Sequence, residues 1–280
     1  MSTTTAITAA DINKLRQATG AGMMDCRKAL TETGGDFEAA IDWLRKQGQK
    51  IAAKRSDREA KEGVVIAQTT ADNKTGFIIC VSCETDFVSK NADFVAFAQS
   101  IADAAVANNV NSVQELNEVL VNGSKVSDLV NDKLASIGEK IGIVKFEKVE
   151  APYVASYIHG AYRLGVLVAL SAAEAEAGKD IAMQIAALNP VAVDANSVSA
   201  EVIERERNIV IETMKADPKM AGKTDDMIAK IAEGKLNAFF KEQTLLAQPF
   251  VKDGGKTVAE YLTSVNKDLK VLSFKRVALG

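Results

Sequence analysis

The stretch that decides the fold is Gly63-Val-Val-Ile-Ala-Gln68, followed by Gly76-Phe-Ile-Ile-Cys-Val-Ser-Cys83. Both runs are short and apolar, and the polar segment Asp72-Asn73-Lys74 lies between them. Two such runs around a polar turn predict a β-hairpin. The apolar-periodic segment 91–105 then predicts a helix, and the alternating segment 143–149 predicts a third strand.

The second half of the chain repeats this order of elements. Residues 154–171 predict another hairpin, 181–188 predict a helix, and 272–277 predict a closing strand that aligns with 143–149 without a gap. The sequence therefore predicts an α+β fold with two related subdomains, each a three-stranded antiparallel sheet with helices on one face. We expect the subdomains at 63–150 and at 151–188 together with 251–280.

The first 46 residues predict a small three-helix domain. Gly20 and Gly22 break the first helix from the second, Gly34-Gly35 end the second, and Asp36 can cap the third. In the second helix, the spacing of Met23, Cys26 and Leu30 predicts an inner face, which leaves Met24 pointing elsewhere.

A basic linker is expected at residues 47–62. Residues 45–62 carry seven basic residues against three acidic ones. A solvated helical linker and a nucleic-acid patch both fit this charge. The linker is favoured because no aromatic residue is interleaved to stack on bases.

An insertion at 189–250 interrupts the second subdomain. Two narrow apolar stripes, at 199–216 and after Thr224, predict an antiparallel helical hairpin of the coiled-coil kind, with a break at Pro218 and Gly222. Most of its surface should face water, and we expect such an arm to contact another molecule.

Composition excludes several classes of function. The chain has 280 residues, of which 47% are apolar, and 34 basic against 37 acidic residues give a net charge of −3. A protein that mainly grips nucleic acid usually carries a basic excess. We expect no direct nucleic-acid partner, no membrane span, no secretion signal and a cytoplasmic location.

Few residues are available for chemistry, so we expect no enzyme active site, metal site or cofactor. Cys80 and Cys83 have redox or zinc spacing, but residues i and i+3 of a strand face opposite sides, which predicts inert, half-buried thiols. The single histidine, His159, is expected to be packed. Gly222-Lys223-Thr224 and Gly255-Lys256-Thr257 lack the earlier glycine of a phosphate-binding loop.

The segment from Thr85 through Asp86 and Phe87 to Val88 stands between a strand and a helix. Such a loop should be polar, yet it places Phe87-Val88 beside an acidic residue. From spacing alone, Phe87 could be a hydrophobic staple packed under the following helix, or an exposed contact for another molecule. Spacing favours the staple.

The chain resembles the bacterial elongation factor Ts family. The resemblance rests on Thr19-Gly-Ala-Gly-Met-Met-Asp-Cys-Arg-Lys-Ala-Leu30 and Cys83-Glu-Thr-Asp-Phe-Val-Ser-Lys-Asn91, and also on His159-Gly-Ala-Tyr-Arg-Leu-Gly-Val-Leu-Val168 and Gln248-Pro-Phe-Val251. The match runs from about residue 8 to residue 277. It implies a ubiquitin-associated-like N-terminal domain. Many members continue past the last strand with a helical module, whereas this sequence ends at Gly280.

The resemblance also implies a function. The protein is expected to be a guanine nucleotide exchange factor for elongation factor Tu, binding its GDP-bound and nucleotide-free forms, with GTP displacing the factor. The segment Thr85, Asp86, Phe87 and Val88 would enter the GTPase near its magnesium ion, and Phe87 would be a wedge rather than a staple. Met23 and Met24 would lie at the contact with the N-terminal domain.

Two other functions compete with this expectation. A ubiquitin-type binding or scaffold protein would use the three-helix unit but leave the duplicated sheets without a role. A redox enzyme would use Cys80 and Cys83. Capture of a translational GTPase from an extract, and exchange activity that survives a double Cys→Ser change, would exclude these two alternatives.

Overall fold

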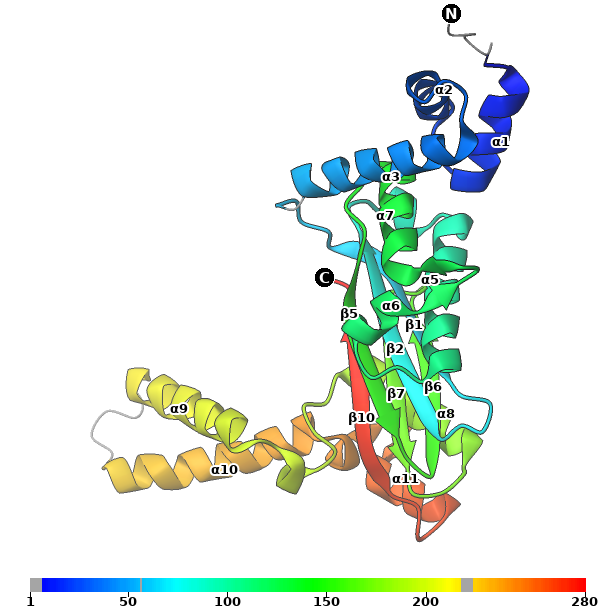
Figure 1. Cartoon of the computed structure of the whole chain (residues 1–280). Coiled ribbons are helices and arrows are strands. Elements are labelled where there is room, and N and C mark those ends of the chain that lie inside the picture. The colour runs from blue at the N-terminus through cyan, green and yellow to red at the C-terminus, as the bar shows by residue number, and fades with distance from the viewer. Residues whose placement is uncertain (1–6, 56, 218–223) are drawn as a thin grey trace, which may run out of the picture.

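The computed structural model describes residues 7–55, 57–217 and 224–280. Helices and small antiparallel sheets alternate along the chain (Figure 1), which confirms the predicted α+β class.

Three helices form the N-terminal unit: α1 (Ala9–Thr19), α2 (Met23–Glu32) and α3 (Phe37–Lys54). A capping box at Thr8 and Asp11 starts α1, and Gly20 ends it with a φ of 68° that favours glycine. Leu15, Cys26 and Leu30 are buried among these helices.

α3 continues to Lys54 and so enters the segment expected to be the linker. The reason is tertiary packing, because α3 lies across α7 (Val126–Ile137) and Ile51 packs on the core below (Figure 1). At Gly48 an added Cβ would lie 2.8 Å from the Cβ of Ala135, so glycine permits this close crossing. Arg45 pairs with Asp132 across the same contact, at 3.8 Å.

The first sheet has the strand order β1-β2-β5 and is antiparallel throughout. Helices cover one of its faces, chiefly α5 and α7, with Phe77 and Phe94 in the core between. The elements of this unit other than α7 are β1 (Glu62–Thr69), β2 (Thr75–Cys83), α4 (Asp86–Ser89), α5 (Ala92–Asn108), α6 (Val113–Glu118), β3 (Leu120–Val121), β4 (Ser124–Lys125) and β5 (Gly142–Glu150).

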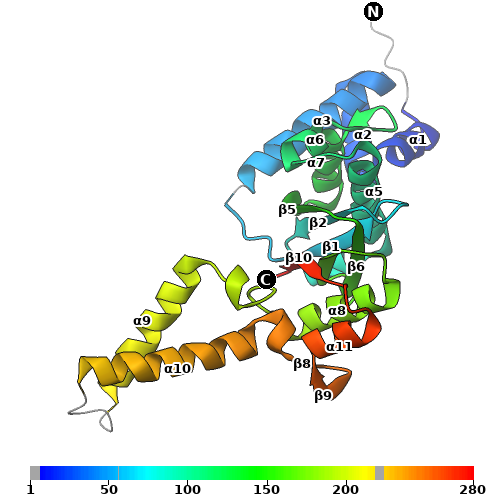
Figure 2. The same ribbon diagram turned by 90° about the horizontal axis from the view of Figure 1, so that it is seen from below.

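The second sheet has the order β10-β7-β6 and is also antiparallel. α8 and α11 cover its outer face, as the view from below makes plain (Figure 2). α8 begins earlier than the sequence pattern indicates. The elements of this unit are β6 (Tyr153–His159), β7 (Leu164–Leu170), α8 (Ala175–Leu188), β8 (Pro249–Phe250), β9 (Asp253–Thr257), α11 (Val258–Val265) and β10 (Val271–Ala278).

The two sheets pack against each other through their inner faces. Alternate residues of β2 point to different cores, so that Ile79 faces the helices while Ile78 faces β7. Two glycines permit the close approach. An added Cβ would lie 2.7 Å from Val154 at Gly76, and 2.9 Å from Val65 at Gly165. The result is a four-layer arrangement of helices, sheet, sheet and helices, with β2 in its middle.

The arm consists of α9 (Ala200–Ala216) and α10 (Asp225–Gln243), and it projects from the side of the second sheet (Figures 1 and 2). Its helices pack on each other through Met214, Ile228 and Ala232, a cluster separate from the sheet cores. Two short 3₁₀ turns, Ala195–Ser197 and Leu245–Ala247, lie at its base. The expected break at Pro218 and Gly222 falls outside the described residues.

Candidate functional site

The Phe87 turn (residues 85–88) leaves the end of β2 and becomes the single-turn helix α4. Thr85 occupies the N-cap with φ −121° and ψ 154°, the extended conformation that is usual at this position. Ser89 is buried, and Val88 packs on the core between the first sheet and its helices. The C-terminal end of the turn is therefore anchored.

Phe87 is 86% exposed, more than any other large apolar side chain in the described part of the chain. The staple interpretation is therefore wrong, because a staple would be packed against the following helix. Asp86, the residue before Phe87, is held by an ion pair. Its carboxylate accepts a hydrogen bond from Lys90 Nζ at 2.6 Å, which lowers the pKa of Asp86.

Two glutamates hold the start of the turn. Glu139 Oε2 accepts the backbone N–H groups of Glu84 and Thr85, each at 3.1 Å, and Glu139 Oε1 accepts the Thr85 hydroxyl at 2.6 Å. Glu84 in turn accepts the N–H of Lys140 at 2.6 Å.

Two arginines of the expected linker pair with Glu84. Arg55 lies 2.6 Å from one carboxylate oxygen and Arg58 3.1 Å from the other. The Lys140 N–H and these two guanidinium groups lower the pKa of Glu84 to about 2. Sequence reasoning does not identify Arg55, Arg58 or Glu139 as part of this site. The basic charge of the linker is the one signal that points to the two arginines, and a solvated linker explains that charge equally well.

Met23 and Met24 are both exposed, at 51% and 73%. Met23 was expected to share the inner face of α2 with Cys26 and Leu30, and this is wrong. Met23 is the first residue of the helix, just after the N-cap Gly22, and its side chain is exposed. The turn before α2 lies near the Phe87 turn, since Gly20 and Phe87 line one surface hollow together with Lys133 of α7. Met23 and Met24 follow Gly20 by a few residues, at the start of α2.

Cys80 and Cys83 lie in different cores, Cys80 between the sheets and Cys83 under the helices. Their thiols diverge as expected, but both are fully buried rather than half-buried, and burial raises their pKa values to about 11 and about 12. His159 is exposed, with Nδ1 2.9 Å from the Tyr157 hydroxyl, so the packed role expected for it is wrong. Among the described residues no group of three metal-ligating side chains occurs.

The structure describes only one of the two Gly-Lys-Thr tripeptides in full. Gly255-Lys256-Thr257 lies at the end of β9, where Thr257 forms a capping box with Glu260 at the start of α11. Gly222 and Lys223 are outside the described residues.

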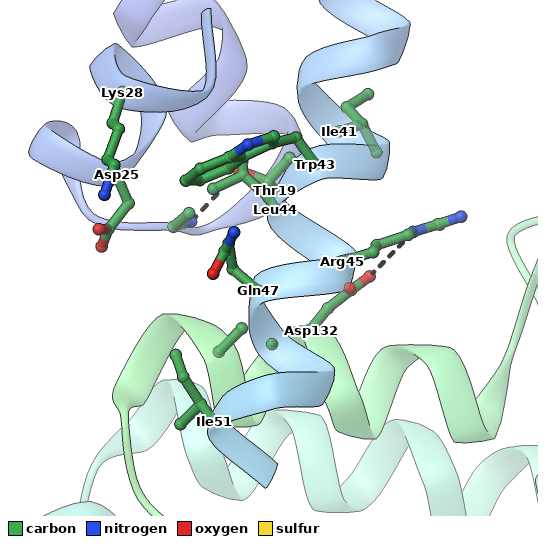
Figure 3. Close-up of a pocket in the computed structure, with 13 residues that line it drawn as sticks. Thr19, Asp25, Lys28, Ile41, Trp43, Leu44, Arg45, Gln47, Ile51 and Asp132 are labelled. Carbon is green, nitrogen blue, oxygen red and sulfur yellow. Dashed lines mark hydrogen bonds and ion pairs between the residues drawn. The ribbon is translucent and has the colours of Figure 1, made fainter. Parts of the chain in front are cut away.

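A cavity of about 160 Å³ lies where α2 and α3 meet α7 (Figure 3). The Trp43 ring forms one wall, Asp25 and Lys28 project from α2 on the other side, and the Arg45–Asp132 pair lies at the α7 end. This cavity lies between the N-terminal unit and the helix α7 that covers the first sheet.

Comparison with known proteins identifies the family. A family model described as Elongation factor TS matches residues 84–280. The chain is 47% identical over 277 residues to elongation factor Ts of Christiangramia forsetii, covering 98% of this chain and 99% of that protein. It is 48% identical over 279 residues to elongation factor Ts of Amoebophilus asiaticus, with the same coverage.

The chain belongs to the elongation factor Ts family. A more distant member, from Methylococcus capsulatus, is 44% identical over 278 residues, covering 98% of this chain and 92% of that protein. Family membership makes this chain a factor of translation elongation, in a family of nucleotide exchange factors. No helix within the described ranges is long and apolar enough to cross a membrane.

Proposed function

We propose that this elongation factor Ts homologue releases GDP from elongation factor Tu by inserting the Phe87 turn near the magnesium and phosphate site of that GTPase. The observation that carries the proposal is the exposed Phe87 side chain on an anchored turn. An apolar side chain that contributes little to the packing of its own chain is available to pack in a partner.

Asp86 and Phe87 have separate tasks in this mechanism. Phe87 wedges between side chains of the partner, while Asp86 reorganises the groups that hold the partner's magnesium ion. The metal is the largest local charge at a nucleotide phosphate, so disturbing it weakens GDP binding. Thr85 and Val88 fix the two ends of the turn.

A wedge alone supplies too little energy. Lowering nucleotide affinity by about 10⁴-fold requires about 5.5 kcal/mol of differential binding. Burying one Phe supplies only about 1.5–3 kcal/mol. A wide contact surface must therefore hold the partner while the wedge acts.

We assign that surface to three parts of the chain. Met23 and Met24 contact the partner from the N-terminal unit, which we take to be ubiquitin-associated-like, and the second subdomain and the arm hold other parts. In this proposal the two sheets are duplicated subdomains and the arm is an antiparallel coiled coil. The expected domain boundaries are kept except that α3 extends to Lys54 and that Phe250 belongs to the second subdomain, in whose core it packs.

The exchange cycle follows from thermodynamic linkage. Factor and nucleotide weaken each other's binding by the same ratio, so the factor binds the GDP form, stabilises the nucleotide-free form and is displaced when GTP binds. The factor needs no chemical active site or cofactor for this cycle, and it acts in the cytoplasm without contacting nucleic acid directly.

Release of fluorescent GDP from elongation factor Tu tests the proposal. A substoichiometric amount of this protein should accelerate release in the presence of excess unlabelled nucleotide, since each molecule of factor turns over. Release at the spontaneous rate, with a correctly folded factor, would contradict the proposed function.

A further inference from the structure

Two carboxylates, those of Glu84 and Glu139, link the Phe87 turn to the segment between α7 and β5. We call this pair of glutamates and their hydrogen bonds the clasp. Glu139 accepts N–H groups from Glu84 and Thr85, and Glu84 accepts the N–H of Lys140 in return. Each glutamate is thus bonded to the backbone of the opposite segment. Reciprocal bonds of this kind fix both the separation and the orientation of two loops, and charged acceptors make them strong.

The clasp changes how α4 begins. Thr85 is at the N-cap, where a hydroxyl usually accepts a hydrogen bond from the helix N–H groups. Here no such bond forms, and the hydroxyl instead donates to Glu139 at 2.6 Å. The first turn of α4, which carries Phe87, is therefore held from outside the helix by the α7–β5 segment.

The linker completes the clasp. Arg55 and Arg58 both pair with Glu84, whose side chain is 13% exposed. The Lys140 side chain also donates to the backbone carbonyl of Arg58, at 2.9 Å. Since Arg55 directly follows α3, the clasp joins the base of the N-terminal unit to the base of the Phe87 turn.

We propose that Glu139 is a positioning residue for Phe87, and that Arg55 and Arg58 act through Glu84 to hold the same turn. The inference deepens the proposed function and rests on it. Glu139 does not need to touch the partner, because it acts by keeping Phe87 at the place where the partner receives it. Displacement of an acting group by about 1 Å can cost up to about a hundredfold in rate.

A double-mutant cycle tests the positioning role. GDP release from elongation factor Tu is measured at saturating factor for the wild type, Glu139→Ala, Phe87→Ala and the double variant. We expect Glu139→Ala to slow release by about tenfold in the wild-type background and to have almost no further effect once Phe87 is absent. A residue that only stabilises the fold would slow release by the same factor in both backgrounds.

Two further variants act as controls. Glu118→Ala removes a carboxylate of α6 that pairs with Lys125 outside the clasp, and it should leave release unchanged. Glu139→Gln keeps an oxygen for the two N–H groups and should recover most of the rate. Amide hydrogen exchange at Glu84 and Thr85 should be faster in Glu139→Ala than in the wild type, independently of any partner.

The possible failures are distinguishable. If the Phe87→Ala factor accelerates GDP release as much as the wild-type factor does, the proposed function is overturned. If GDP release is slow with Phe87→Ala but equally fast with Glu139→Ala and with the control Glu118→Ala, only the positioning role is overturned. Equal slowing by Glu139→Ala in both backgrounds, or a Glu139→Gln variant as slow as Glu139→Ala, would also overturn that role.

Discussion

At the scale of single residues, Phe87 and Phe77 represent opposite uses of one side chain. Phe77 is fully buried, whereas Phe87 is 86% exposed. The hydrophobic effect rewards only the area removed from water, so Phe87 contributes little to folding and its apolar area is available for binding. Its position depends on hydrogen bonds made by its neighbours rather than on its own packing.

The exposed methionines lead to the first prediction. Met24→Ala should weaken the complex with elongation factor Tu by about fivefold, which corresponds to about 1 kcal/mol, because a flexible apolar contact is lost. Titration calorimetry measures the effect, with Leu120→Ala, an exposed apolar change on β3, as the control. Equal affinities for the wild type and Met24→Ala would mean that Met24 is ordinary surface.

The depressed pKa of Glu84 leads to a second prediction, about pH. The pKa is about 2 in the folded chain against a usual value of 4.5. The carboxylate therefore stabilises the fold fully above pH 4.5, and this contribution is lost as the pH falls toward 2. The free energy of unfolding of Glu84→Gln should lie below that of the wild type at pH 7 and approach it at low pH.

Urea unfolding of both proteins at pH 7 and near pH 3 makes this comparison. Because glutamine does not titrate, the difference between the two proteins isolates the ionisation of Glu84. A difference that is the same at both pH values would show that the Arg55 and Arg58 pairs do not depend on this charge.

At the scale of elements, β2 shows what the sequence can and cannot predict. Its continuous apolar run identifies a strand, and its turn identifies the partner β1, because both signals are local. A run without alternation is also typical of a strand covered on both faces. The stacking of the two sheets, however, depends on Gly76 and Gly165 meeting side chains of distant strands, and a single sequence does not pair such positions.

The candidate site likewise has a part that the sequence predicts and a part that it does not. The family signature around Thr85 and Phe87 locates the turn, but spacing alone favoured a buried Phe87. The residue that holds the start of this turn, Glu139, lies 54 residues beyond Thr85 in the sequence, so no local pattern connects the two. Long-range contacts also explain the extension of α3, since α7 covers Gly48 and Ile51.

The arm leads to a third prediction. Deletion of residues 199–242, closed with a short Gly/Ser linker, should leave a folded protein with weaker exchange activity. The arm has its own apolar cluster, whereas its base is held separately by bonds from Val191 N to Gln243 O and from Leu245 N to Ala192 O. The Phe87 turn follows β2 of the first sheet and is retained.

Thermal unfolding and GDP release together report on the deletion variant. A single cooperative transition with reduced but measurable exchange is expected. Loss of cooperative unfolding would mean that the arm belongs to the core of the second subdomain.

At the scale of the whole molecule, the two stacked sheets form the centre to which the N-terminal unit and the arm are attached. The N-terminal unit lies at one end and the arm projects from the side (Figure 1). The Phe87 turn lies near the N-terminal unit, since it shares a hollow with Gly20. This arrangement suits a protein that must hold a partner at several places while one side chain acts.

The most direct measurement is the rate of GDP release from elongation factor Tu with wild-type factor and with Phe87→Ala, alongside the melting temperature of each. We predict release slower by at least about tenfold with an almost unchanged melting temperature, because Phe87 is exposed in the free chain. Unchanged release would contradict the wedge. A melting temperature lowered by more than about 5 °C would contradict the exposed position of Phe87.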